Sequence, residues 1–340
     1  MEPRIQNGFL RAIIFMPMWF VTLTLVMTLS SLLIIAFSGN IGFLLQLCFF
    51  IIFLLAHFNK NRLLDFLSLV IFFAMIFSNM TYYENMANTV STEALFSNMS
   101  FDSPVMLFLT ASQILASFLA LWFATKFIDR KPLMSIGLSV KDKANEMLVG
   151  LGFALAFIGG LFLVLWLLGA IALTGYVGFK PGVFIVSMML FLAAFDEELI
   201  FRGYILNNMM DSSSRWVALA GSSALFALMH AGNPSVWSNW VPMTELFAAG
   251  FILGISYTFT KNLWFPTFFH FGWNFFQGLL GFEISGINVD SWKMISHENT
   301  GNIPGIISGG AFGIEGSVIT LSCTIICTYF IYKYYNELNK

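Results

Sequence analysis

The stretch AIIFMPMWFVTLTLVMTLSSLLIIAF, residues 12–37, runs for 26 residues without a charged side chain. About 20 apolar residues in a helix span the hydrocarbon core of a bilayer, so this run predicts a membrane-spanning helix. It is longer than the apolar region of a signal peptide and lacks a small-residue cleavage site. We therefore expect it to be retained as the first span.

The composition of the whole chain extends this interpretation. Hydrophobic residues make up 58% of the 340 residues and charged residues only 10%, whereas a soluble domain carries roughly 25% charged residues. The net charge of -2 provides no basic field that would attract nucleic acid. We predict an all-α, polytopic transmembrane bundle of about ten helices that contacts membrane lipids and binds no nucleic acid.

Ten segments along the chain are apolar and long enough to be read as spans. They lie near 12–37, 41–58, 63–80, 104–125, 147–173, 182–207, 215–232, 243–260, 263–282 and 303–332.

The charges of the connecting loops predict the orientation, because basic loops favour the cytoplasmic side. The loops 59–62 and 126–143 are basic, whereas 81–103 and 283–302 are acidic. Ten spans with both termini in the cytoplasm satisfy these four loops. Lys180, which then falls outside, is an exception.

Three acids and one base interrupt the apolar run 184–206, where ionisable side chains are costly and indicate function. Glu198 and Arg202 are four residues apart on one helix face, so we predict that they form an ion pair. Glu197 is rotated by about 100° from Glu198 and stays free to accept a proton or hold a water. The third acid is Asp196. The alternative interpretation is a structural ion-pair cluster at a helix end.

Two later helices carry further polar side chains. A single His such as His230 on an apolar helix is more often a packing residue than a catalyst. His270 and Asn274 share a helix face, which also fits a pair that only joins helices. Glu197 and His230 are nevertheless almost equally far along the chain from the polar turn 211–214. In an antiparallel helical hairpin they would therefore lie at the same membrane depth.

We predict that this carboxylate, the two imidazoles and the amide converge inside the bundle. Such a group suggests hydrolysis. The Glu would activate a water, a His or Asn would stabilise an oxyanion, and a metal would replace or assist either.

Taken in order, the three groups resemble the signature motifs of the CAAX-protease and bacteriocin-processing (CPBP or ABI) family. The likeness covers roughly residues 145–285. It implies an intramembrane endopeptidase in a bacterial cell membrane that cleaves a CAAX-type, leader or other hydrophobic peptide. It also implies that Glu198 and Arg202 hold the first motif in place. The motifs read Glu197-Glu198-x-x-x-Arg202, Phe226-x-x-x-His230 and His270-x-x-x-Asn274.

The resemblance implies a role for each remaining polar residue. Glu197 would activate the water and His230 would assist it, while His270 and Asn274 would stabilise the oxyanion. Glu197, His230 and His270 would alternatively supply three ligands to a divalent metal such as zinc. That arrangement would leave Glu198 or Asp196 as the nearby base, and the sequence leaves the choice open.

These predictions divide the chain into three parts: N-terminal helices of unknown role (1–143), a peptidase core (144–285), and an outside loop with the last helix (286–340). Two other functions remain open. A non-catalytic membrane scaffold or bacteriocin immunity protein would use the polar cluster for binding, but the complete polar set favours the enzyme. A proton-relaying transporter would need paired halves with matching broken helices, which the sequence does not show.

Overall fold

The computed structural model describes residues 2–37 and 104–338. The chain divides into two compact units, Met1–Val26 with Phe101–Lys340, and Met27–Ser100, and the larger unit carries all the predicted site residues. The described residues are mostly helical, which confirms the predicted all-α membrane bundle. Helices long and apolar enough to cross a membrane lie at Gly8–Leu33, Pro104–Asp129, Ala144–Leu167, Val241–Thr260 and Val318–Leu338.

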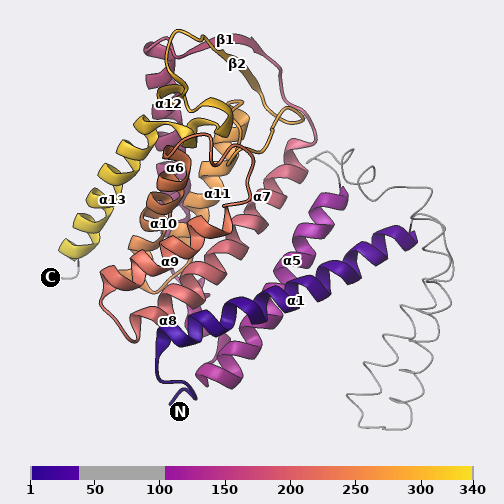
Figure 1. Cartoon of the computed structure of the whole chain (residues 1–340), viewed down its shortest axis with the longest axis vertical. Coiled ribbons are helices and arrows are strands. Elements are labelled where there is room, and N and C mark those ends of the chain that lie inside the picture. The colour runs from indigo at the N-terminus through magenta and orange to yellow at the C-terminus, as the bar shows by residue number, and fades with distance from the viewer. Residues whose placement is uncertain (1, 38–103, 339–340) are drawn as a thin grey trace. The chain divides into compact units, whose positions relative to one another are not determined.

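The helices of the larger unit lie side by side (Figure 1). Helix α6 packs against α11, helix α10 packs against α9 and α13, and α7 contacts both α5 and α11. The elements are α1 (Gly8–Phe37), α5 (Pro104–Phe123), α6 (Ala144–Leu167), β1 (Ile171–Tyr176), α7 (Val183–Glu198), α8 (Asn207–Met210), α9 (Arg215–Met229), α10 (Val241–Thr260), α11 (Trp264–Leu279), β2 (Ile295–Asn299), α12 (Gly305–Ser308) and α13 (Val318–Leu338).

Two predicted spans have the wrong extent, and the predicted number of ten is not confirmed. The span 147–173 ends early because α6 stops at Leu167 and Gly169 adopts a positive φ of 68°. The span 303–332 begins late, because its first part is α12 and two short 3₁₀ turns, and α13 starts only at Val318. Gly309, Gly310 and Gly313 take positive φ values there, which a continuous helix excludes. The predicted spans 41–58 and 63–80 lie outside the described residues.

A small antiparallel sheet covers one end of the bundle (Figure 1). Strand β1 pairs with β2 from Ile171 opposite Asn299 to Tyr176 opposite Ile295, with an irregularity between Leu173 and Gly175. The predicted span 147–173 includes the first three residues of β1, 171–173, as the end of a helix. The sheet joins two segments that are far apart in sequence, so the end of α6 and the long loop after α11 form one cover.

The helix that carries the acids changes its winding directly after them. Residues Leu199–Leu206 form a π-helix between α7 and α8, and all eight are buried. A 3₁₀ turn at Leu133–Ile136 packs on this segment, since a Cβ at Gly203 would lie 3.1 Å from the carbonyl oxygen of Ile136. Short π-helical segments often occur at functional sites.

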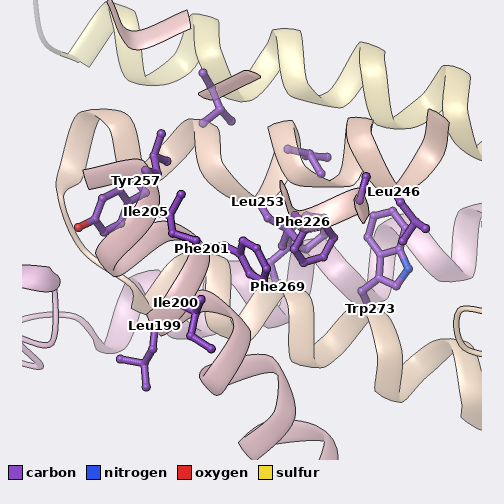
Figure 2. Close-up of a cluster of buried hydrophobic side chains, with 14 of the residues drawn as sticks. Leu199, Ile200, Phe201, Ile205, Phe226, Leu246, Leu253, Tyr257, Phe269 and Trp273 are labelled. Atoms are coloured by element: carbon purple, nitrogen blue, oxygen red, sulfur yellow. The ribbon is translucent and has the colours of Figure 1, made fainter. Parts of the chain in front are cut away.

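Aromatic and aliphatic side chains from four helical segments meet in the middle of the unit (Figure 2). Phe201 follows α7, Phe226 lies on α9, Leu253 lies on α10, and Phe269 and Trp273 lie on α11. Each of these side chains is 5% exposed or less. They fix the distances between the helices that carry the predicted site residues.

Small residues let neighbouring helices approach closely, because a larger side chain would not fit between them. A Cβ at Gly250 on α10 would lie 2.6 Å from the Cβ of Ser223 on α9. A Cβ at Gly272 on α11 would lie 2.7 Å from the Cβ of Ala154 on α6. Small residues serve the same purpose at many helix contacts in membranes.

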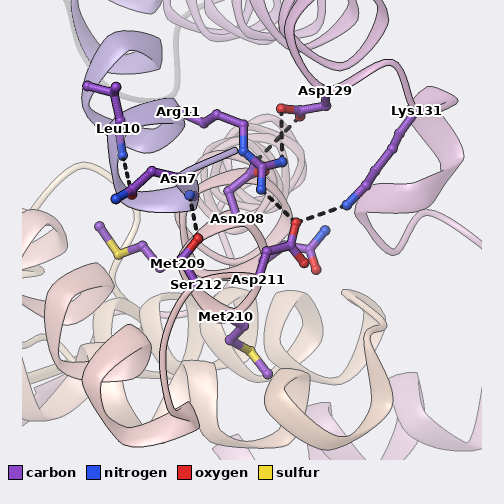
Figure 3. Close-up of polar contacts among 12 residues, drawn as sticks. Asn7, Leu10, Arg11, Asp129, Lys131, Asn208, Met209, Met210, Asp211 and Ser212 are labelled. Atoms are coloured by element: carbon purple, nitrogen blue, oxygen red, sulfur yellow. Dashed lines mark hydrogen bonds and ion pairs between the residues drawn. The ribbon is translucent and has the colours of Figure 1, made fainter. Parts of the chain in front are cut away.

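A polar cluster joins the start of α1 to two loops (Figure 3). The buried Arg11 guanidinium bonds Asp129 at 3.3 Å and Asp211 at 2.8 Å, and Lys131 bonds Asp211 at 3.0 Å. The backbone N–H of Gly8 donates to the Ser212 hydroxyl at 2.6 Å. The beginning of α1, the loop 126–143 and the turn 211–214 therefore lie at the same end of the bundle.

We expect Gly250→Ala to destabilise the protein by about 1–3 kcal/mol, because the added methyl group would meet the backbone of α9. Thermal unfolding of the purified protein in detergent measures this loss. Gly152→Ala on α6 is the matched control, because nothing lies within 4 Å of a Cβ at that position. Equal melting temperatures for wild type and Gly250→Ala would show that the α9–α10 contact tolerates a wider spacing.

Candidate active site

The four predicted catalytic residues line one cavity of about 350 Å³. Glu197 lies on the last turn of α7, His230 is the residue that caps the C-terminus of α9, and His270 and Asn274 lie on α11. The predicted convergence of these four side chains is confirmed.

Glu197 faces both imidazole rings without bonding either. Its Oε2 atom lies 3.9 Å from Nε2 of His230 and 3.9 Å from Nε2 of His270. These distances exceed those of a hydrogen bond. The same Oε2 atom is buried and has no hydrogen-bond partner among the described residues. The Glu197 carboxylate and the two imidazoles thus lie beside one another in the cavity.

The opposite nitrogen of each ring fixes its orientation. Nδ1 of His230 lies 2.8 Å from the carbonyl oxygen of Phe226, and Nδ1 of His270 lies 2.9 Å from Oε1 of Glu198. Because both partners are acceptors, both Nδ1 atoms carry the proton and donate it. In the neutral rings, Nε2 then has a free lone pair that points toward Glu197.

Glu198 and Arg202 form the predicted ion pair, and Glu197 does not share it. Nη1 of Arg202 lies 2.9 Å from Oε1 of Glu198, and the two side chains are 1% and 0% exposed. Arg202 also donates to the carbonyl oxygen of Gly250 at 3.3 Å and stacks over the Phe226 ring at 4.6 Å. Sequence reasoning missed that Glu198 holds His270 as well, because that contact joins α7 to α11.

Residues 178–276 match the family described as type II CAAX prenyl endopeptidase Rce1-like. The family resemblance is confirmed over these residues. The match begins before α7, ends within α11 and contains all six predicted site residues. It supports a CAAX-type intramembrane endopeptidase in general, with a protein or peptide substrate in the membrane. No curated protein and no solved structure matches the chain.

The cavity also has walls that the sequence did not predict. Trp19 of α1 and Gln113 of α5 line it, as does Glu315, which precedes α13. Residues of α1, of α5 and of the segment before α13 therefore complete the cavity around the predicted core. The signal used for the other acids also applies to Glu315, because an ionisable residue in an otherwise apolar, Gly-rich segment indicates function.

Glu315 fixes the loop after α11 next to Asn274. Its Oε1 atom accepts the indole N–H of Trp273 at 3.0 Å, and its Oε2 atom accepts the backbone N–H of Ser285 at 2.6 Å and its hydroxyl at 3.0 Å. Burial raises the pKa of the Glu315 carboxyl, and the Ser285 donors oppose that shift. Asn274 itself has no side-chain hydrogen-bond partner within the described part of the chain, so its amide is available to a substrate.

The side chains in their present positions do not fit a zinc ion. Ligand atoms at about 2.0–2.1 Å from a tetrahedral zinc lie about 3.3 Å apart, whereas Glu197 Oε2 lies 3.9 Å from each imidazole nitrogen. Over residues 2–37 and 104–338, no group of three or more His, Cys, Asp or Glu side chains is arranged to hold a metal ion. The predicted metal therefore stays a prediction.

We expect Glu198→Ala to cost about 3–5 kcal/mol of stability, because it leaves the Arg202 guanidinium buried without a counter-ion. Glu197→Ala is the matched control, since its side chain is 28% exposed and forms no such pair. Denaturant or thermal unfolding in detergent compares the two variants. Equal losses of stability would contradict the assignment of the structural ion pair to Glu198 and not to Glu197.

Proposed function

We propose that the protein is an endopeptidase that hydrolyses a peptide bond inside the bundle with a water activated by Glu197. The observation that carries the proposal is the position of Glu197 Oε2, which lies 3.9 Å from Nε2 of both His230 and His270 and has no hydrogen-bond partner in the described unit. Polar groups that face one another beyond direct hydrogen-bond distance can be joined by a water molecule.

The tautomers determine how this water is held. Glu197 Oε2 accepts one of its protons, and the free Nε2 lone pair of His230 accepts the other. One lone pair of the water oxygen is then free to attack a carbonyl carbon in the cavity. His230 can only accept in this state, which suits the predicted assisting role.

The attack forms a C–O bond as Glu197 takes the proton of the water and the carbonyl oxygen becomes an oxyanion. The free amide of Asn274 donates to this oxyanion. His270 donates a second bond when Nε2 is protonated, and Glu198 stabilises that charged ring through Nδ1. When the C–N bond breaks, Glu197 returns its proton to the departing amine.

The substrate proposed for this site is a membrane-associated hydrophobic peptide of the CAAX or leader type. The cavity walls are largely apolar and include Met189, Leu190 and Leu253. The matched family is described as a prenyl endopeptidase, which supports a substrate that carries a lipid or a comparably apolar segment.

We further propose that the protein lies in a bacterial cell membrane with both termini in the cytoplasm. The end of the bundle that holds Arg11 and Lys131 carries the basic loop 126–143. Basic residues favour the cytoplasmic side. The sheet of β1 and β2 lies at the other end (Figure 1).

A labelling experiment tests this orientation. In a chain without native cysteines, we expect Tyr176→Cys to react with an impermeant maleimide in intact cells. Tyr176 is 73% exposed on β1. Arg130→Cys in the basic loop should react only after the membrane is permeabilised. The reverse pattern would invert the assigned orientation.

We expect Glu197→Gln to reduce proteolysis by about 10²–10⁴-fold while the protein stays folded, because Gln cannot take a proton from water. Cleavage of a quenched CAAX-type peptide by the purified protein in liposomes measures this. His230→Ala should be comparably damaging, and Asn274→Ala should cost about 10²-fold. Glu245→Gln is the matched control, because Glu245 is a buried acid that does not line the cavity.

Two outcomes would overturn the assignment. Full activity of Glu197→Gln would show that another group is the base. A wild type that cleaves no peptide, together with a Glu197 variant that still rescues its cellular phenotype, would establish the scaffold or immunity function instead. Chelator treatment decides the metal question, since we expect no inhibition, and inhibition that added zinc reverses would restore the predicted metal.

A further inference from the structure

The cavity contains more carboxyl groups than the proposed reaction uses. Three carboxyl groups line it, those of Asp196, Glu197 and Glu315, and no Lys or Arg among the described residues does so. Arg202 lies behind the cavity wall and is already paired with Glu198. The cavity therefore disfavours anionic groups and has a surplus of hydrogen-bond acceptors.

Among these acids, Asp196 is the one without an assigned role. Glu197 faces the imidazoles, and both oxygens of Glu315 are bonded by Trp273 and Ser285. Asp196 receives one hydrogen bond, from Nε2 of Gln113 to Oδ2 at 2.9 Å. Its side chain is fully buried beside the Ser117 hydroxyl, and its Oδ1 atom has no hydrogen-bond partner among the described residues.

An unpartnered buried carboxyl oxygen is costly unless a ligand satisfies it. No cation of the described chain pairs with Asp196, and the acid next to it in sequence is Glu197. A group that both donates hydrogen bonds and carries positive charge would satisfy Oδ1 and offset the charge of the carboxylate.

The cavity that Asp196 lines has both apolar and polar walls. Met106, Met189 and Leu190 provide apolar wall, while Thr110 and Gln113 add polar groups from the same face of α5. Lys and Arg have an apolar stem that ends in a charged head. The stem would lie along the Met and Leu side chains, and the head would reach Asp196.

We propose that Asp196 and Gln113 form a subsite that binds the charged head of a Lys or Arg side chain of the substrate. The inference rests on the proposed function, because it places the subsite beside the same Glu197. It makes Asp196 a specificity-determining residue that selects peptides with one basic residue near the scissile bond.

Binding to an inactive chain tests the subsite independently of catalysis. The probes are fluorescent apolar hexapeptides that are identical except for Lys, norleucine or Glu at each position in turn. In the full-length Glu197→Gln variant, we expect Lys at one position to raise affinity over norleucine by at least about 30-fold. Adding Asp196→Asn should remove this preference, whereas adding Glu245→Gln should leave it unchanged.

A second substitution guards against misfolding of Asp196→Asn. Gln113→Lys would place an ammonium group of the protein itself beside Asp196, so it should fold, satisfy Oδ1 and abolish the preference for Lys. The proposal is overturned by equal affinities for the Lys and norleucine peptides. A preference for Lys that survives both substitutions overturns it as well.

Cleavage of the same peptides by wild type separates this inference from the proposed function. A wild type that cleaves none of them, with an Asp196-dependent preference for Lys in binding, would refute the peptidase and retain the subsite. Cleavage and binding that are both indifferent to Lys would refute the subsite and retain the peptidase.

Discussion

The buried carboxylate of Glu198 is the interaction on which the arrangement of the site depends. One of its oxygens accepts from Arg202 on the same helix and from His270 on α11. A charge in this apolar setting is tolerated only when it is paired and hydrogen-bonded. The pair with Arg202 meets that need, and the bond to His270 ties α11 to α7 at the depth of the cavity.

This use of Glu198 leaves its neighbour Glu197 free. Adjacent residues on a helix point in different directions, so one acid is held in the wall while the next faces the cavity. The helix widens into a π-helix directly after Glu198, and the Arg202 side chain on that segment still pairs with Glu198. Both imidazoles are oriented from behind, by a carboxylate and by a backbone carbonyl, so their free nitrogens converge on Glu197.

The cavity is built by more of the chain than the segment that carries the family motifs. Trp19 and Gln113 come from the N-terminal helices, and Glu315 comes from the Gly-rich segment before α13. The reacting groups come from α7, α9 and α11, and the three wall residues shape the space around those groups.

The sequence by itself determined the spans that are long and apolar, the ion pair of Glu198 with Arg202, and the shared depth of Glu197 and His230. These features follow from local periodicity and from the cost of charge in lipid, which a single segment reveals. Only the tertiary structure decided that Glu198 also holds His270, that Gln113 meets Asp196, and that Ile171–Tyr176 is a strand paired with the loop after α11. Each of these depends on a partner more than 70 residues away in the chain, and helical periodicity carries no information about such partners.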